Sequence, residues 1–288
     1  MKLTIHGYST ALFATWYFIE ELGLLFDAGD GVTSNLLGKS GKIKHVFVSH
    51  ADRDHLGGLF QYNQLFANRK PKIFYPKDSG SFPFIETFTS KFDPHTTGTE
   101  WIPLENEQVV QIKNNYEVFC FENKHINVSN QLKSLSFRVA ETKKKLKPEF
   151  RSLVQQDLIN LKKEKGDDFI NEQVKRTILT YSGDTPVFDY SKYDNSEILI
   201  HEATFLTKEE LASGNDKNKH SSLEEVMEMV ANINIDKLIL GHFSSRYYMN
   251  DIDNAIKKYI KHYNIKIPVY RIPIGITEKD ILNGKTIN

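Results

Sequence analysis

The sequence of 288 residues has only one cysteine, Cys120, so no disulfide can form within the chain. It also lacks an excess of either charge, because 37 lysines and arginines balance 37 aspartates and glutamates. This balance argues against a surface coated for nucleic acid but leaves a local basic patch open. No apolar stretch is long enough for a signal peptide or a membrane-spanning helix, so we expect a cytoplasmic protein that does not bind membranes. The composition, 40% hydrophobic and 26% charged, is typical of a globular protein.

Histidine and aspartate are concentrated in residues 49–58, which read SHADRDHLGG. This stretch follows an apolar run at 46–48 that predicts a buried strand, and apolar residues at helical spacing come after it. The ligand-type residues of the strand-to-helix turn are His50, Asp52, Asp54 and His55. Imidazole and carboxylate suit zinc, manganese or iron, so the stretch predicts a metal site. The alternative is a polar loop whose acids cap the next helix.

Polar residues also end four other apolar runs that predict strands. These runs stop at Asp27, Asp184, Glu202 and His242. Strand ends on one side of a sheet are where α/β proteins assemble their sites, so five such clusters together predict one functional site. Asp27 is interpreted either as a turn former or as a carboxylate that supports the ligands from behind.

Two more histidines are ambiguous from their local sequence. His125 lies between two predicted strands, where a lone histidine is usually a surface residue. His220 precedes Ser221 and Ser222, each of which has a glutamate three residues on, the pattern of a capping box at a helix start.

Residues 142–176 are the most basic part of the chain. Lysines flank apolar residues at helical spacing, which predicts an amphipathic helix. The helix is interpreted either as a solvated surface element or as a contact for RNA phosphates. Because we find no repeat, low-complexity segment or linker, we predict a single domain over residues 1–288, with 142–176 as a basic helical insertion.

Five motifs make the sequence similar to the metallo-β-lactamase superfamily, and within it to the ribonuclease Z branch. Residues 50–55 resemble the superfamily's His-x-His-x-Asp-His motif, and SGDT at 182–185 resembles its bridging-aspartate motif. HEATF at 201–205, KHSS at 219–222 and HFSSRY at 242–247 resemble ribonuclease Z more closely than other branches. The resemblance implies an α/β fold, namely a four-layer αβ/βα sandwich of two mixed sheets with helices on the outer faces. It also implies two divalent metal ions at one edge.

The resemblance assigns seven metal ligands, three to a first ion, three to a second and one between them. The ligands of the first ion are His50, Asp52 and His125. Those of the second ion are Asp54, His55 and His242, and Asp184 lies between the two ions. Zinc is the expected metal, with manganese and iron as alternatives. His125 thereby changes from an expected surface residue to an expected ligand.

The resemblance also implies catalytic and substrate-binding roles. Glu202 and His220 match the pair that is thought to pass a proton to the leaving oxygen. Asp54 would orient the attacking water, while Ser244 and Arg246 would contact the substrate phosphate. Two divalent ions in such a site lower the pKa of a bound water and clamp the oxygens of a phosphodiester.

Two departures from the family pattern matter. Asp52 stands where the family has its second histidine, which lowers the formal charge of the site by one unit and favours harder metals such as manganese. Alternatively, Asp52 is not a ligand and the first site is weak. Ribonuclease Z binds tRNA with a Gly/Pro-rich arm. The corresponding interval of this sequence has few glycines and prolines, so we expect a helix in place of the arm.

We therefore predict a metal-dependent hydrolase, a phosphodiesterase that resembles ribonuclease Z and processes tRNA precursors at their 3′ ends. A second hypothesis is hydrolysis of a smaller ester or cyclic phosphodiester, favoured by the missing arm and the zero net charge. A third is a non-catalytic metal-binding member of the fold, although Glu202 and His220 would then have no use. A homodimer is an option that the sequence leaves open.

Overall fold

Two β-sheets lie face to face in the computed structural model, which describes residues 2–92, 97–211 and 219–288. The first sheet has six strands in chain order, with β1 to β3 antiparallel and β3 to β6 parallel. Its strands are β1 (Ile5–Thr10), β2 (Ala14–Ile19), β3 (Leu24–Phe26), β4 (His45–Phe47), β5 (Lys72–Pro76) and β6 (Glu100–Leu104).

The second sheet has seven strands in the order β15-β14-β13-β12-β11-β8-β7, parallel from β12 to β15 and antiparallel elsewhere. Its strands are β7 (Val109–Lys113), β8 (Tyr116–Glu122), β11 (Leu135–Leu146), β12 (Asn171–Tyr181), β13 (Ser196–Glu202), β14 (Ile235–Gly241) and β15 (Val269–Arg271). A separate short hairpin consists of β9 (Asn127–Val128) and β10 (Gln131–Leu132).

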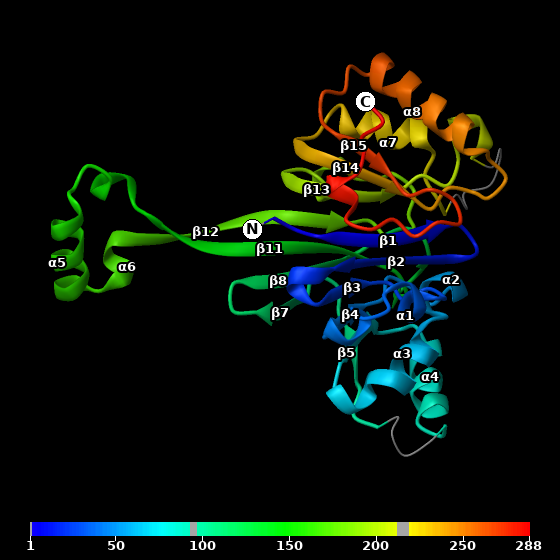
Figure 1. Cartoon of the computed structure of the whole chain (residues 1–288), viewed down its shortest axis with the longest axis horizontal. Coiled ribbons are helices and arrows are strands. Elements are labelled where there is room, and N and C mark those ends of the chain that lie inside the picture. The colour runs from blue at the N-terminus through cyan, green and yellow to red at the C-terminus, as the bar shows by residue number, and fades with distance from the viewer. Residues whose placement is uncertain (1, 93–96, 212–218) are drawn as a thin grey trace.

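Helices cover the outer face of each sheet (Figure 1). The first sheet carries α1 (Val32–Asn35), α2 (Arg53–Leu56), α3 (Leu59–Phe66) and α4 (Ser81–Thr89), and the second carries α7 (Leu223–Val230) and α8 (Met249–His262). The predicted capping box is confirmed at Ser222, whose hydroxyl accepts from the Glu225 backbone N–H while the Glu225 carboxylate accepts from the Ser222 N–H.

Three hydrophobic clusters fill the three interfaces between these four layers. The central cluster joins the two sheets, with Phe26 and Phe47 of the first packed on Phe137 of the second at ring-centroid distances of 5.6 and 5.4 Å. A second cluster lies under α7 and α8, and a third lies under α1, α3 and α4. Each layer can bury an apolar face only against its neighbour, so this arrangement follows from the apolar patterning. The predicted four-layer α/β sandwich with two mixed sheets is confirmed.

Residues 142–176 form an arm that projects from the body of the molecule (Figure 1). β11 and β12 continue outward as a two-stranded ribbon, and α5 (Gln155–Lys165) and α6 (Asp167–Ile170) lie at its tip. The expected helix is present as α5, but 142–146 and 171–176 are strand, so the segment is a ribbon with helices at its tip and not a helix alone. The lysine-rich strand ends leave the core and so show no apolar alternation that would have indicated a strand.

Within the described residues, no helix is both long and apolar enough to cross a membrane.

Candidate metal centre

The predicted ligands meet at one edge of the sandwich, where strands of both sheets end. His50 and α2 follow β4, His125 follows β8, Asp184 follows β12, and His242 follows β14. The carboxyl ends of parallel strands face the same way, so strands far apart in the sequence place their polar ends together. All of these side chains are buried except that of Asp52, which is 55% exposed. Asp52 therefore marks the open side of the centre.

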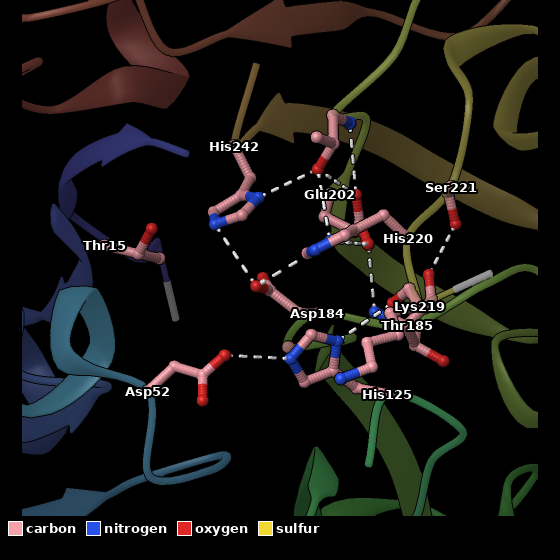
Figure 2. Close-up of polar contacts among 12 residues, drawn as sticks. Thr15, Asp52, His125, Asp184, Thr185, Glu202, Lys219, His220, Ser221 and His242 are labelled. Atoms are coloured by element: carbon pink, nitrogen blue, oxygen red, sulfur yellow. Dashed lines mark hydrogen bonds and ion pairs between the residues drawn. The ribbon is translucent and has the colours of Figure 1, made fainter. Parts of the chain in front are cut away.

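The first ligand group consists of His50, Asp52 and His125, whose ligand atoms all lie within 4.8 Å of one another. The Asp52 Oδ2 atom lies 3.5 Å from His50 Nε2. It lies 3.3 Å from His125 Nε2 (Figure 2). Asp52 is the N-cap residue of α2 but makes no capping hydrogen bond with its side chain. The alternative that this acid serves to cap the helix is therefore wrong.

The second ligand group consists of Asp54, His55 and His242. The Asp54 Oδ2 atom lies 3.6 Å from His55 Nε2 and 3.4 Å from His242 Nε2. Asp184 lies between the two groups, with its Oδ2 atom 3.2 Å from both His55 and His242 and 3.8 Å from His50. The structure thus brings together all seven residues that the sequence analysis named.

The nitrogens of these histidines fit a metal site. The four outer nitrogens are each hydrogen-bonded, His50 Nδ1 to Ser49, His55 Nδ1 to Asp27, His125 Nδ1 to the Lys219 carbonyl and His242 Nδ1 to Thr204. The inner Nε2 atoms of His50 and His55 are fully buried and have no hydrogen-bond partner among the described residues. A buried nitrogen without a partner is costly unless a cation takes its lone pair. The donor set therefore fits two divalent ions.

Two matching chains of hydrogen bonds fix these imidazoles. The Ser49 hydroxyl donates to Asp27 at 2.9 Å, so its oxygen accepts from the Nδ1–H of His50. In the same way the Thr204 hydroxyl donates to Glu202 at 2.6 Å, so its oxygen accepts from the Nδ1–H of His242. In both chains the Nδ1 proton leaves Nε2 with a free lone pair that faces the centre.

Asp27 lies behind the ligands and is completely buried. Its carboxylate accepts from the Ser49 N–H at 2.6 Å, from His55 Nδ1–H at 2.7 Å and from the Tyr181 hydroxyl. These contacts match the second interpretation of Asp27, as a carboxylate that supports ligands, better than the first.

The backbone is strained where two of these residues leave their strands. Asp27 and His242 have φ values of 53° and 61°, in the left-handed region that costs a non-glycine residue about 1–2 kcal/mol. Such outliers persist where surrounding contacts over-determine them, and they cluster at functional sites. Gly183, just before Asp184, has φ 58°, and a Cβ atom there would lie 2.9 Å from the Ser49 side chain.

Burial and the charges of the centre act differently on its two most buried histidines. Burial, together with the neighbouring His55, lowers the pKa of His50 to about 4, so His50 is neutral at physiological pH. Burial also opposes a charge on His55, but Asp184 and Asp27 outweigh it and raise its pKa well above the usual range. The position between these two carboxylates therefore attracts positive charge.

Glu202 and His220 form an ion pair at the rim of the centre. The Glu202 Oε1 atom lies 3.1 Å from His220 Nδ1 and accepts from the Thr185 N–H at 3.0 Å. His220 Nδ1 also lies 3.8 Å from Asp184 Oδ2 (Figure 2). Burial disfavours the imidazolium, but the Glu202 carboxylate outweighs it and raises the pKa of His220 to about 9. His220 is therefore protonated at neutral pH and can donate a proton.

Arg246 and Ser244 are not part of either ligand group. The Arg246 guanidinium donates to Glu210 at 2.7 Å and to the Tyr247 hydroxyl at 2.6 Å, and it is half exposed. The Ser244 backbone N–H donates to the Thr204 carbonyl. Their roles in binding a substrate phosphate stay predictions.

The sequence analysis missed three residues that orient the ligands: Ser49, Thr204 and Tyr181. Ser49 lies in the motif at 49–58 and Thr204 in the motif at 201–205, so their position in these motifs could have identified them as candidates. Tyr181 is separated from Asp27 by 154 positions in the chain, so only the packing of one sheet on the other reveals its contact.

No family model matches the chain. The chain is 28% identical over 271 residues to ribonuclease Z of Methanocaldococcus jannaschii, covering 83% of this chain and 82% of that protein. It is 26% identical over 278 residues to the chloroplastic tRNase Z TRZ2 of Arabidopsis thaliana, covering 91% of this chain and 73% of that protein.

Solved structures share the fold. The short form of human tRNase Z superposes with a TM-score of 0.62 at 18% identity, covering 96% of this chain and 99% of that one. The metallo-β-lactamase fold protein YhfI of Bacillus subtilis superposes with a TM-score of 0.63 at 17% identity, covering 96% and 100%.

Proposed function

The chain has the metallo-β-lactamase fold and resembles ribonuclease Z in sequence, and from this premise we propose that it is a metal-dependent endoribonuclease that processes tRNA precursors at their 3′ ends. The observation that carries the proposal is that two metal-ligand groups and a proton-donating pair share one edge of the sandwich. A phosphodiesterase that uses metal ions needs these two parts, one for the attacking water and one for the leaving oxygen.

Two divalent ions would be held by the two ligand groups, with Asp184 between them. When bound, such ions lower the pKa of a water and stabilise the negative charge that develops on a phosphodiester. Zinc is the first candidate for nitrogen and oxygen ligands, with manganese and iron as alternatives.

The remaining roles belong to side chains of this chain. The buried Asp54 carboxylate, whose pKa the nearby imidazoles hold at about 2 against the effect of burial, is ionised and would orient the water. His220 would donate its proton to the 3′ leaving oxygen, and Glu202 would hold the imidazole in place. Arg246 would contact phosphate only after it exchanges Glu210 for the substrate.

A long RNA also needs a surface away from the metal ions. We propose that the chain acts as a single domain and that the arm at 142–176 contacts RNA phosphates. Because 142–176 project from the body as a ribbon with helices at its tip, the chain offers such a surface, which weakens the argument for a smaller ester or cyclic phosphodiester. The Glu202–His220 contact argues against a non-catalytic protein, and a cytoplasmic location and a homodimer stay predictions.

The first test is removal of the metal. Purified protein should contain up to two divalent transition ions per chain, and chelation should abolish hydrolysis of bis(p-nitrophenyl) phosphate. Adding the ions back should restore hydrolysis in step with the occupancy measured by elemental analysis. Full activity of metal-stripped protein would contradict the proposal.

A further inference from the structure

The two ligand groups have the same donor atoms. Each combines two histidines with one aspartate, and Asp184 lies next to both. In the superfamily motif the position of Asp52 is a histidine, which would give the first group three imidazoles. With Asp52 in place of that histidine, both sites have two imidazole ligands.

The geometry of Asp52 matches that of Asp54. Asp52 Oδ2 lies 3.5 and 3.3 Å from its two histidine nitrogens, and Asp54 Oδ2 lies 3.6 and 3.4 Å from its own two. Ligands of one ion lie roughly 3–3.6 Å apart when their bonds to it are about 2.0–2.2 Å long. Both carboxylates thus already stand at the separation of two ligands that share an ion.

The surroundings of the two aspartates differ. Asp54 is buried and accepts a hydrogen bond from the Leu12 backbone N–H at 3.0 Å. Asp52 is 55% exposed, and among the described residues its side chain has only the histidines His50 and His125 within reach. Its hydrogen bond with His125 Nε2 at 3.3 Å joins it to an imidazole of the same ligand group, which favours a role as a ligand.

We propose that Asp52 gives the first site two histidines and two carboxylates, its own and that of the shared Asp184, and that this lowers the preference of that site for Zn(II) over Mn(II) and Fe(II). Carboxylate oxygen suits the harder ions better than imidazole nitrogen does, so exchanging one imidazole for a carboxylate shifts the relative affinities towards those ions. Zn(II) still binds more tightly than Mn(II) in absolute terms, so the change is in the ratio of affinities. The inference rests on the proposed function only in taking these ligands as those of the catalytic ions.

The test is competitive metal loading without substrate. Metal-free wild type, D52H and D52N are equilibrated with buffered mixtures of Zn(II) and Mn(II), and bound metal is measured by elemental analysis. D52H should raise the ratio of bound zinc to manganese roughly tenfold or more. D52N should hold one ion fewer than the wild type, because an amide oxygen is a weaker ligand than a carboxylate.

D236H is the matched control, because Asp236 is an exposed aspartate at the start of β14 and lies outside both ligand groups. D236H adds an imidazole outside both ligand groups and should leave the ratio of bound zinc to bound manganese unchanged. Equal metal ratios in D52H and wild type, or two ions retained in D52N, would overturn the proposal. The metal-loading test contains no RNA, so its failure would not contradict the proposed function. Conversely, a protein that does not cleave tRNA would still show by its metal ratio whether Asp52 sets the metal preference of the first site.

Discussion

Glu202 determines the protonation state of the residue that we propose as the proton donor. His220 is mostly buried, and burial alone would lower its pKa. The Glu202 carboxylate 3.1 Å away and Asp184 reverse this and raise the pKa to about 9. The imidazolium is therefore the form present at neutral pH, and it is lost as the pH rises through that value.

Substituting His220 should separate proton donation from metal binding, and E202Q is compared at equal metal content because Glu202 also holds Thr204 against the ligand His242. H220A should lower turnover of an unactivated diester roughly a hundredfold or more, the scale of a general acid, with metal content unchanged. E202Q removes the charge that stabilises the imidazolium, so the pKa of His220 should fall. The alkaline limb of the pH–rate profile should then move to lower pH.

His262 provides the control, because it is an exposed histidine in the last turn of α8, and H262A should leave turnover and metal content unchanged. An alkaline limb at the same pH in E202Q and wild type would remove Glu202 from the relay. Loss of metal in H220A would make His220 a ligand, a role for which Asp184 and His125 are near enough.

The residues of the site were predictable to the extent that they lie in local motifs. His50, Asp54 and His55 follow one another in the chain, so the sequence shows them together. His125 could be identified only by resemblance, because its neighbours in sequence give no sign of the imidazoles 4.4 and 4.9 Å from its ring. Ser49 and Thr204 were not predicted because a hydroxyl group orients a ligand only when the fold places it against that ligand.

At the scale of elements, the arm is where the structure departs most from the sequence analysis. Its lysines are partly neutralised, since Lys144 pairs with both Asp167 and Asp168, and Lys143 pairs with Glu141. Among the described residues, no ion pair is formed by Lys145 or Lys163, and both are exposed. These two lysines are therefore among the charges of the arm that are available to RNA phosphates.

Removing both charges should weaken RNA binding in a salt-dependent way. K145A/K163A should raise the Kd for a tRNA precursor and reduce the slope of log Kd against log salt by about two, near one unit for each lost phosphate contact. Hydrolysis of bis(p-nitrophenyl) phosphate should stay unchanged, because the arm projects away from the body.

The matched control is K257A/K261A, which removes two exposed lysines from α8. It should leave the affinity and the salt slope near those of the wild type. Equal weakening by both pairs would show that overall charge, and not the arm, governs RNA binding. Equal loss on the small diester would show that the arm lysines act through folding or the metal centre.

The strands that hold the site could be predicted because they are buried runs, such as β4 and β14, whose apolar residues stand out against their surroundings. The ribbon of the arm could not be predicted, since its outer half lies outside the core and carries lysines on exposed faces. The helix predicted within 142–176 lies at its tip, where it begins at Gln155 after a single 3-10 turn at Pro148–Phe150.

At the scale of the whole molecule, the four-layer sandwich explains why ligands from distant segments meet. The two sheets pack through a shared aromatic core, and the strand ends of both open onto the same edge. The fold and the similarity to ribonuclease Z, predicted from five motifs, are confirmed by the sequence relatives and the solved structures. Because the net charge is zero, RNA must be attracted by local patches and not by the molecule as a whole.

The measurement that tests the central claim most directly is the cleavage of a tRNA precursor that carries a 3′ trailer, with analysis of both new ends. Metal-loaded wild type should cut once at the 3′ side of the tRNA, leaving a 3′-hydroxyl on the tRNA and a 5′-phosphate on the trailer, and chelation should stop the reaction. An intact precursor, incubated with protein that holds two ions and hydrolyses bis(p-nitrophenyl) phosphate, would contradict the claim and favour a smaller phosphodiester as the substrate.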